Sequence, residues 1–166
     1  MSPSAGNDLA ALQLRAAGRR VLVAEDDDDL RLLLAVALRS QGYRVDEVSD
    51  GAALLEHLAG SHGARASSHA GRAGSHAEGP NRPAGDDPFD LLISDLHIPC
   101  LSGLDVLASL RDAASRLPVI LITADHNPQP EALARRLGAA AYFHKPFDVC
   151  DLLTAVINVS PRVPAG

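Results

Sequence analysis

Four short apolar runs in this 166-residue chain each lead into polar residues that bind metal ions and phosphoryl groups in proteins. The runs are 21–24, 91–94, 119–122 and 141–144, and the polar residues at or just after their ends are Glu25 with Asp26, Asp95, Thr123 and Lys145. Because helical patterns separate the runs, the strands are expected to lie parallel, with their carboxyl ends along one edge of a sheet. Ligands bind at that edge in open α/β sheets. The sequence therefore predicts a site there for a divalent metal ion and a phosphoryl group.

Composition limits the alternatives. With 46% hydrophobic residues the chain can bury one good core, but it has no room for two ordinary domains. The formal net charge of −6 argues against a nucleic-acid-binding module, which needs a basic surface. Two cysteines provide no disulfide framework and fit a reducing compartment, and no long apolar run indicates a membrane span or a secretory leader. We therefore expect a soluble cytoplasmic protein without direct membrane or nucleic-acid contact.

Hydrophobic periodicity predicts five strands that alternate with five helices. The expected strands are Arg20–Ala24, Tyr43–Val48, Phe89–Ser94, Pro118–Ile122 and Ala140–Phe143. The expected helices are Leu30–Ser40, Gly51–Leu58, Leu104–Ala114, Pro130–Leu137 and Phe147–Val159, with a loop over His97–Gly103. Strict alternation of this kind is typical of a doubly wound sheet with helices on both faces.

Three segments fall outside this alternation. Residues 1–18 are expected to form a flexible extension, with a short helix possible over Asp8–Ala17, and residues 161–166 a tail. Residues 59–88 are almost free of large apolar side chains and contain an imperfect seven-residue repeat that opens with Ser-His three times. No leucine-like residue fills a coiled-coil seam there. We expect a disordered insertion that interrupts a single domain of residues 19–160; weak metal binding by the repeat histidines is the alternative.

Four sequence blocks resemble the signature of the response-regulator receiver domain of two-component signalling, of the chemotaxis-receiver type. They are VLVAEDD, DLLISDLHIPCLSGLDVL, PVILITA and GAAAYFHKPFD, in the right order between Arg20 and Val159 and interrupted only by the insertion. The resemblance implies a flavodoxin-like fold, in which a five-stranded parallel sheet of order 2-1-3-4-5 carries helices on both faces.

The resemblance also implies a role for each strand-end residue. Asp95 matches the phosphoacceptor, which receives a phosphoryl group from a histidine kinase or phosphotransfer protein. Glu25 and Asp26, with Asp95 and the backbone carbonyl of His97, match the ligands of Mg²⁺, which Mn²⁺ could replace. Thr123 matches the hydroxyl residue and Lys145 the lysine that contact the phosphoryl group. Thr123 and Tyr142 match the pair that switches conformation.

Elementary chemistry supports these roles independently. Clustered carboxylates repel one another, and a hard divalent cation with oxygen ligands neutralises them. A carboxylate can attack phosphorus to form an acyl phosphate, and positive charge lowers the barrier by countering the equatorial phosphoryl oxygens. Taken one at a time, however, the same residues have structural explanations. Thr123 and Tyr142 could serve turn formation and packing, and Lys145 could be solvated. The His97 side chain could lie at the rim of the pocket, and Asp27, Asp28 and Asp29 are expected to start the next helix. Cys100, Cys150, His57 and His126 are expected to be inert surface residues.

Several positions depart from the usual family pattern. Glu25 replaces the commoner aspartate, Ser102 stands where an acid or asparagine is common, and Cys100 where glycine is common. His97, two residues after Asp95, occupies a position that affects how fast the phosphoryl group is lost. The chain ends just after its last expected helix, which suggests a single-domain regulator, monomeric or weakly dimeric, whose output passes through a partner protein or a phosphorelay.

Two rival functions remain open on sequence alone. A metal-dependent phosphatase also forms an aspartyl phosphate, but such enzymes usually carry a second acid two residues after the nucleophile, where this chain has His97. A receiver-like scaffold that binds its partner without phosphorylation would not need magnesium. The favoured expectation is a phosphoacceptor module that assists its own phosphorylation and dephosphorylation without being an enzyme.

Overall fold

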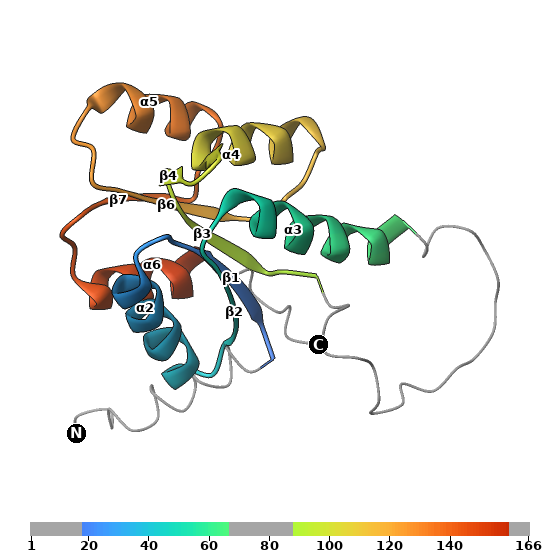
Figure 1. Cartoon of the computed structure of the whole chain (residues 1–166), viewed down its shortest axis with the longest axis horizontal. Helices are drawn as coiled ribbons and strands as arrows, with labels where there is room; N and C mark the ends of the chain where they lie inside the picture. Colours follow the sequence, from blue (N-terminus) through green and yellow to red (C-terminus); the bar gives the residue numbers. More distant parts are fainter. Residues whose placement is uncertain (1–17, 67–87, 160–166) are drawn as a thin grey trace, which may run out of the picture.

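The strands pair in the predicted order. In the computed structural model, which describes residues 18–66 and 88–159, a parallel sheet runs β2-β1-β3-β6-β7 (Figure 1). The strands of the sheet are β1 (Arg20–Ala24), β2 (Arg44–Val48), β3 (Leu91–Asp95), β6 (Val119–Thr123) and β7 (Ala141–His144). The helices are α2 (Asp28–Ser40), α3 (Gly51–Ala66), α4 (Gly103–Asp112), α5 (Pro128–Arg136) and α6 (Val149–Val159). Two further short strands, β4 (His97–Ile98) and β5 (Leu101–Ser102), pair only with each other, so the five strands of the main sheet follow the flavodoxin-like order 2-1-3-4-5, which is confirmed.

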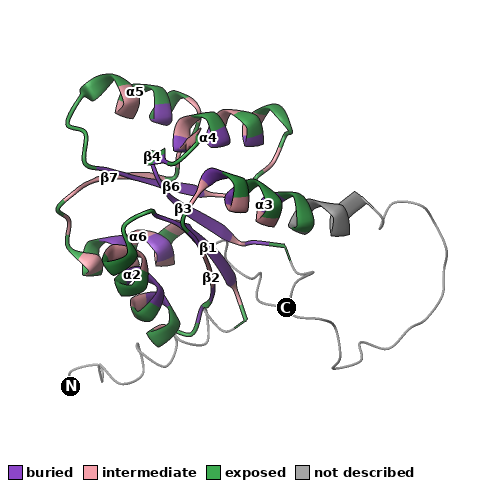
Figure 2. Cartoon of the chain, in the orientation of Figure 1, coloured by how far each residue is buried: buried purple, intermediate pink, exposed green. Residues whose placement is uncertain are grey.

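Helices cover both faces of the sheet, and each face has its own apolar core. Leu22, Leu92 and Leu121 point to the face covered by α3, α4 and α5. Val21, Ile93 and Ile120, which alternate with them in sequence, point to the face covered by α2 and α6. Strands buried on both faces read as continuous apolar runs, which explains the composition of β1, β3 and β6. Figure 2 shows these central strands as the buried layer between the helices.

Side-chain caps set several helix starts close to the predicted positions. Asp27 caps α2 by accepting a hydrogen bond from the Leu30 N–H, and Asp28 and Asp29 occupy the first turn, as expected for acids at a helix N-terminus. Asn127 caps α5, which begins with Pro128, two residues before the expected start. Apart from the end of α3, the other boundaries coincide with the expected ones or differ from them by one or two residues.

Two expectations were wrong in detail. Helix α3 does not end at Leu58 but continues to Ala66, into the segment predicted to be disordered from residue 59. The loop expected over His97–Gly103 contains a small antiparallel hairpin of β4 (His97–Ile98) and β5 (Leu101–Ser102). The remainder of the insertion (67–87), the N-terminal extension up to residue 17 and the tail lie outside the described residues.

Candidate phosphoryl and metal site

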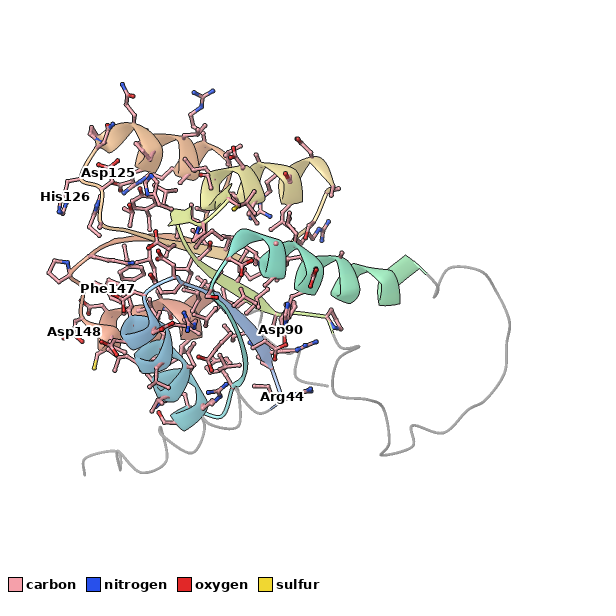
Figure 3. All side chains as sticks on the ribbon, in the orientation of Figure 1. Arg44, Asp90, Asp125, His126, Phe147 and Asp148 are labelled. Carbon is pink, nitrogen blue, oxygen red and sulfur yellow. The ribbon has the colours of Figure 1, made fainter. Side chains whose placement is uncertain are left out.

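The structure brings Glu25, Asp26, Asp95 and Lys145 together at the carboxyl edge of the sheet. Asp95 ends β3 with 8% of its side chain exposed. Glu25 directly follows β1 and is almost fully buried, whereas Asp26 is exposed at the start of the turn into α2. One carboxylate oxygen from each of these three acids lies within 4.8 Å of the others. In Figure 3, Asp125, His126, Phe147 and Asp148 lie at this carboxyl edge of the sheet, whereas Arg44 and Asp90 lie at the opposite edge.

Lys145, which directly follows the edge strand β7, connects Asp95 with Glu25. Its Nζ lies 2.5 Å from Asp95 Oδ2 and 2.9 Å from both carboxylate oxygens of Glu25. Partial burial lowers the pKa of Lys145, but its hydrogen bonds to Asp95 and Glu25 outweigh that effect and leave the pKa above its ordinary value. Lys145 is therefore a fixed positive charge, and it is the only lysine in the sequence.

Glu25 is the most perturbed acid. Burial raises its pKa to about 7, the Lys145 hydrogen bond opposes that rise, and the Asp95 charge adds to it. Oε1 also accepts a long hydrogen bond, 3.3 Å, from the Asp27 N–H, whereas Oε2 accepts none. A buried carboxylate oxygen without a hydrogen bond is costly unless a cation lies near it, and the Lys145 ammonium lies 2.9 Å from this one.

The Asp95 side chain is held by the loop that follows β3. Asp95 Oδ1 accepts a hydrogen bond of 2.8 Å from the His97 N–H, while the His97 side chain is exposed. Gly103, where the hairpin ends, comes so close that a Cβ atom there would lie 2.7 Å from the Asp95 carbonyl oxygen. Only glycine permits that approach. Between Asp26 and the hairpin lies an open cleft of about 520 Å³.

Two hairpin residues that differ from the usual family pattern, Cys100 and Ser102, fit the local geometry. Ser102 caps α4 by accepting a hydrogen bond from the Leu104 N–H, so it replaces an acid without loss of the cap. Cys100 has a positive φ of 68°, a conformation that side chains rarely adopt, and its side chain is exposed.

Thr123 and Tyr142 lie next to this site but are not joined to Asp95 in the structure. Thr123 is fully buried at the end of β6, and its Oγ1 accepts a hydrogen bond of 2.9 Å from the Asp125 N–H. The Tyr142 side chain packs on the α4 and α5 side of the sheet, and its buried hydroxyl has no hydrogen-bond partner among the described residues. Burial raises the pKa of Tyr142; the Thr123 side chain is close enough to lower it, although the two do not meet in hydrogen-bonding geometry.

Two residues that shape the surroundings of the site, Arg31 and His144, were not identified from the sequence. Arg31 donates a hydrogen bond of 2.8 Å to the Glu25 carbonyl and pairs with Asp28, which fixes the turn that carries the acid pair. Its spacing of three residues from Asp28 on a helix was a usable signal. His144 contacts Asp125 and Glu131, residues far from it in sequence, and no sequence pattern indicated these contacts.

Of the remaining positions expected at the surface, His126 and Cys150 are exposed. His57 is instead half-buried, and its Nδ1 lies 2.8 Å from the Ala53 carbonyl oxygen. The Asp148 carboxylate next to Cys150 raises the pKa of that thiol, which keeps it in its less reactive form. None of the helices in the described part of the chain has the length and apolar content needed to cross a bilayer.

Comparisons with known proteins agree with this geometry. The family model of the response regulator receiver domain matches residues 73–157, just over half of the chain, a range that includes Asp95, Thr123 and Lys145 but not Glu25 and Asp26. The transcriptional regulatory protein PdtaR of Mycobacterium tuberculosis is 34% identical over 143 residues, which cover 85% of this chain and 56% of PdtaR. The chain spans about half the length of many of the curated relatives it matches.

Solved structures are similar over most of the chain. The non-phosphorylated HemR receiver domain of Leptospira biflexa has a TM-score of 0.63 and 25% identity, covering 89% of this chain and 98% of that one. A response regulator from Burkholderia pseudomallei, solved with a phosphorylated aspartic acid, a calcium ion and citrate, has a TM-score of 0.59 and 25% identity, covering 82% of this chain and 65% of that one. Together with the strand order and the acidic edge, these matches show that the chain belongs to the response regulator receiver domain family of two-component signalling.

Proposed function

We propose that this chain is a phosphorylation-activated signalling switch that accepts a phosphoryl group on Asp95. The carrying observation is that the Asp95 carboxylate lies at the carboxyl edge of the sheet between a fixed ammonium, Lys145, and two further acids, Glu25 and Asp26. The donor would be a histidine kinase or a histidine phosphotransfer protein of the cytoplasm. The output would pass through a partner protein or a phosphorelay, with the chain acting as a monomer or weak dimer.

The acids fit a hard divalent cation. Glu25 Oε2 is buried without a hydrogen bond, and oxygen atoms of Glu25, Asp26 and Asp95 lie within 4.8 Å of one another. We propose that these three side chains hold Mg²⁺, or Mn²⁺ in its place, with the backbone carbonyl of His97 as a further ligand. When bound, the metal ion supplies positive charge against the phosphoryl oxygens and the crowded carboxylates.

The chain's own groups do the rest of the chemistry. An Asp95 carboxylate oxygen attacks phosphorus, a new oxygen–phosphorus bond forms, and the bond to the donor breaks with its electron pair leaving on the donor nitrogen or, for acetyl phosphate, on acetate. Lys145 must give up part of its contact with Asp95 and contact the transferred group instead. The His97 N–H holds Asp95 Oδ1 in place, which orients the carboxylate before attack.

Signal output requires a second state. We propose that the Thr123 hydroxyl is drawn toward the phosphoryl oxygens and that Tyr142, whose hydroxyl is already buried beside it, adjusts its position in response. The equilibrium can shift only by the difference in contacts between the two states, and one hydrogen bond to a charged group contributes about 1.5–3 kcal/mol. The faces affected would be those of α5, β7 and α6.

Intact-mass analysis after incubation with acetyl phosphate and Mg²⁺ tests the phosphoacceptor. Wild-type protein should gain one phosphoryl group and Asp95→Asn none, because a carboxamide does not attack phosphorus. Asp112→Asn, which changes an exposed acid at the end of α4, serves as the matched control and should label like wild type. Full labelling of Asp95→Asn would reject the assignment.

The same assay separates the two rival functions. Continuous turnover of a generic phosphate ester would indicate a phosphatase. Wild-type protein that neither binds Mg²⁺ nor reacts with any phosphodonor would indicate a scaffold that works without phosphorylation.

A further inference from the structure

His144, at the end of β7, joins three segments of the chain beside the switch residues. Its Nδ1 lies 3.0 Å from the carbonyl oxygen of Asp125 in the β6–α5 loop, and its Nε2 lies 3.3 Å from Glu131 Oε2 on α5. The imidazole stacks on His126, with ring centroids 5.3 Å apart and planes inclined by 18°. The Tyr142 ring meets it edge-on at 5.3 Å.

The partners of His144 favour its charged form. A carbonyl oxygen and a carboxylate oxygen can only accept hydrogen bonds, so both contacts are hydrogen bonds at once only when both ring nitrogens carry a proton. Only the imidazolium form has two N–H groups. A neutral ring would keep one bond and turn a lone pair toward the other acceptor. The Glu131 carboxylate is held in its charged form, because hydrogen bonds from Arg135 and then from His144 lower its pKa.

The contacts of His144 lead directly to the switch. Asp125 is held at both ends of its backbone: its N–H donates to Thr123 Oγ1 at 2.9 Å, and its carbonyl accepts from His144 at 3.0 Å. Thr123 and His144 are also register partners on β6 and β7. If Thr123 moves toward Asp95, the Asp125 segment must follow it or lose that bond. A charged His144 opposes movement of the Asp125 segment, because its hydrogen bonds tie that segment to β7 and to Glu131.

We propose that His144 is a positioning residue whose charged form holds the β6–α5 loop in the arrangement seen here, so that acidification weakens the response of the switch to phosphorylation. This inference rests on the proposed function of Asp95 and Thr123.

The other titratable and charged groups around His144 define the controls. From α5 come Glu131 and Arg135, from the β6–α5 loop the Asp125 carboxylate and His126, and from β7 itself Tyr142 and the neighbouring Lys145. His126 shares the imidazole chemistry of His144, but its only interaction described in the structure is the stacking. It is therefore the matched histidine control.

The experiment measures the affinity of the full chain for beryllofluoride, a phosphoryl mimic, at saturating Mg²⁺ between pH 6 and pH 8. Wild type, His144→Gln and His126→Gln are compared. Glu25 and the metal site are the same in all three proteins, so their contribution cancels in the comparison. From pH 6 to pH 8 the affinity of wild type should rise about two- to fivefold more than that of His144→Gln, as expected for a partly exposed charge pair. His126→Gln should follow wild type.

Two further measurements make the outcome decisive. Glu131→Gln, which leaves His144 in place but removes the carboxylate, should flatten the pH profile in the same way. Long-range nitrogen NMR of the imidazoles should show both His144 nitrogens protonated at pH 6. Parallel profiles for wild type and His144→Gln, or a neutral His144 at pH 6, would overturn the inference while leaving the proposed function intact. Absence of beryllofluoride binding in every variant at every pH would reject the proposed function, and this inference with it.

Discussion

Lys145 and Asp95, 50 residues apart in sequence, meet at the carboxyl edge of the sheet with Nζ 2.5 Å from Oδ2. The contact joins the outermost strand β7 to the central strand β3 across β6. Glu25, 120 residues from Lys145, shares the same ammonium. The positive charge needed for phosphoryl transfer is thus already in place before any phosphoryl group arrives, and it is held by the groups that would carry out the reaction.

Replacing Lys145 should separate metal binding from phosphorylation. Lys145→Ala frees Asp95 and Glu25 from their shared partner, so Mg²⁺ affinity should be unchanged or higher, while labelling by acetyl phosphate should slow about 10²- to 10³-fold for loss of a transition-state contact. Lys145→Arg keeps the charge and should recover part of the rate. Calorimetry with Mg²⁺ and a labelling time course followed by intact mass give the two quantities. Loss of both together would mean that Lys145 acts only by holding the fold.

Glu25→Gln should change stability in a pH-dependent way. Burial raises the pKa of Glu25 from 4.5 to about 7, so its contribution to wild-type stability is fully present below pH 4.5 and is lost as the pH rises through 7. Glutamine does not titrate. In metal-free buffer the advantage of Glu25→Gln over wild type in the free energy of unfolding should therefore grow across this window, by about 1–3 kcal/mol. Urea denaturation at both ends of the window measures it, with exposed Asp29→Asn as control; a constant difference would refute the shift.

The double variant Glu25→Gln with Asp26→Asn tests the metal site. It removes two of the three clustered carboxylates, so Mg²⁺ binding should be lost while the fold is retained or strengthened by relief of like-charge repulsion. Titration with Mn²⁺, followed by paramagnetic broadening of NMR signals, reports binding residue by residue. Broadening around Asp95 that matches wild type at the same Mn²⁺ concentration would place the metal elsewhere.

Thr123→Ala should uncouple phosphorylation from its consequence. Asp95 and Lys145 are unchanged, so labelling should continue, but the face of α5, β7 and α6 should respond much less. Backbone amide shifts over residues 130–159, recorded with and without beryllofluoride, measure the response. Thr123→Ser retains the hydroxyl and should restore most of it. Shifts of equal size in wild type and Thr123→Ala would mean that the signal leaves the site by another route.

Replacing residues 67–87 with a short Gly-Ser link should leave phosphorylation nearly unchanged. The chain enters β3 at Leu91, at the opposite end of that strand from Asp95. In general, the entropy cost of closing a flexible loop rises by only about 0.6 kcal/mol for each doubling of its length. The replacement begins after Ala66 because helix α3 reaches that residue. Labelling rate and unfolding midpoint are the readouts, and a marked fall in either would show that the segment contributes to the domain.

The sheet was predictable because each central strand is buried on both faces and so appears as an unbroken apolar run. For the same reason the strand ends were visible as sudden changes to Glu25, Asp95 and Thr123. Their convergence followed from the parallel arrangement alone. The contact partners did not follow, since the Lys145 to Glu25 contact joins the two ends of the domain and no local pattern specifies it.

Local exceptions explain the remaining errors. Helix α3 extends through small residues that give no periodic signal. The β4–β5 hairpin turns at Pro99 and Cys100, where Cys100 takes a positive φ without the glycine or asparagine that would have indicated a turn. His144 appeared only as the end of a strand, because its role depends on a loop and a helix that pack against it.

Burial differs sharply between the two sides of the site. Every residue of β1 and β3, the strands that lead to the acids, is buried, whereas every residue of β7, which carries Tyr142 and His144 and leads to Lys145, is only half-buried. Displacing a strand costs free energy in proportion to the apolar surface it uncovers. The acids therefore follow strands that are costly to displace, and the lysine follows a strand that is easier to displace. A chemical change at Asp95 would then be transmitted through β7, at a surface where another protein could detect it.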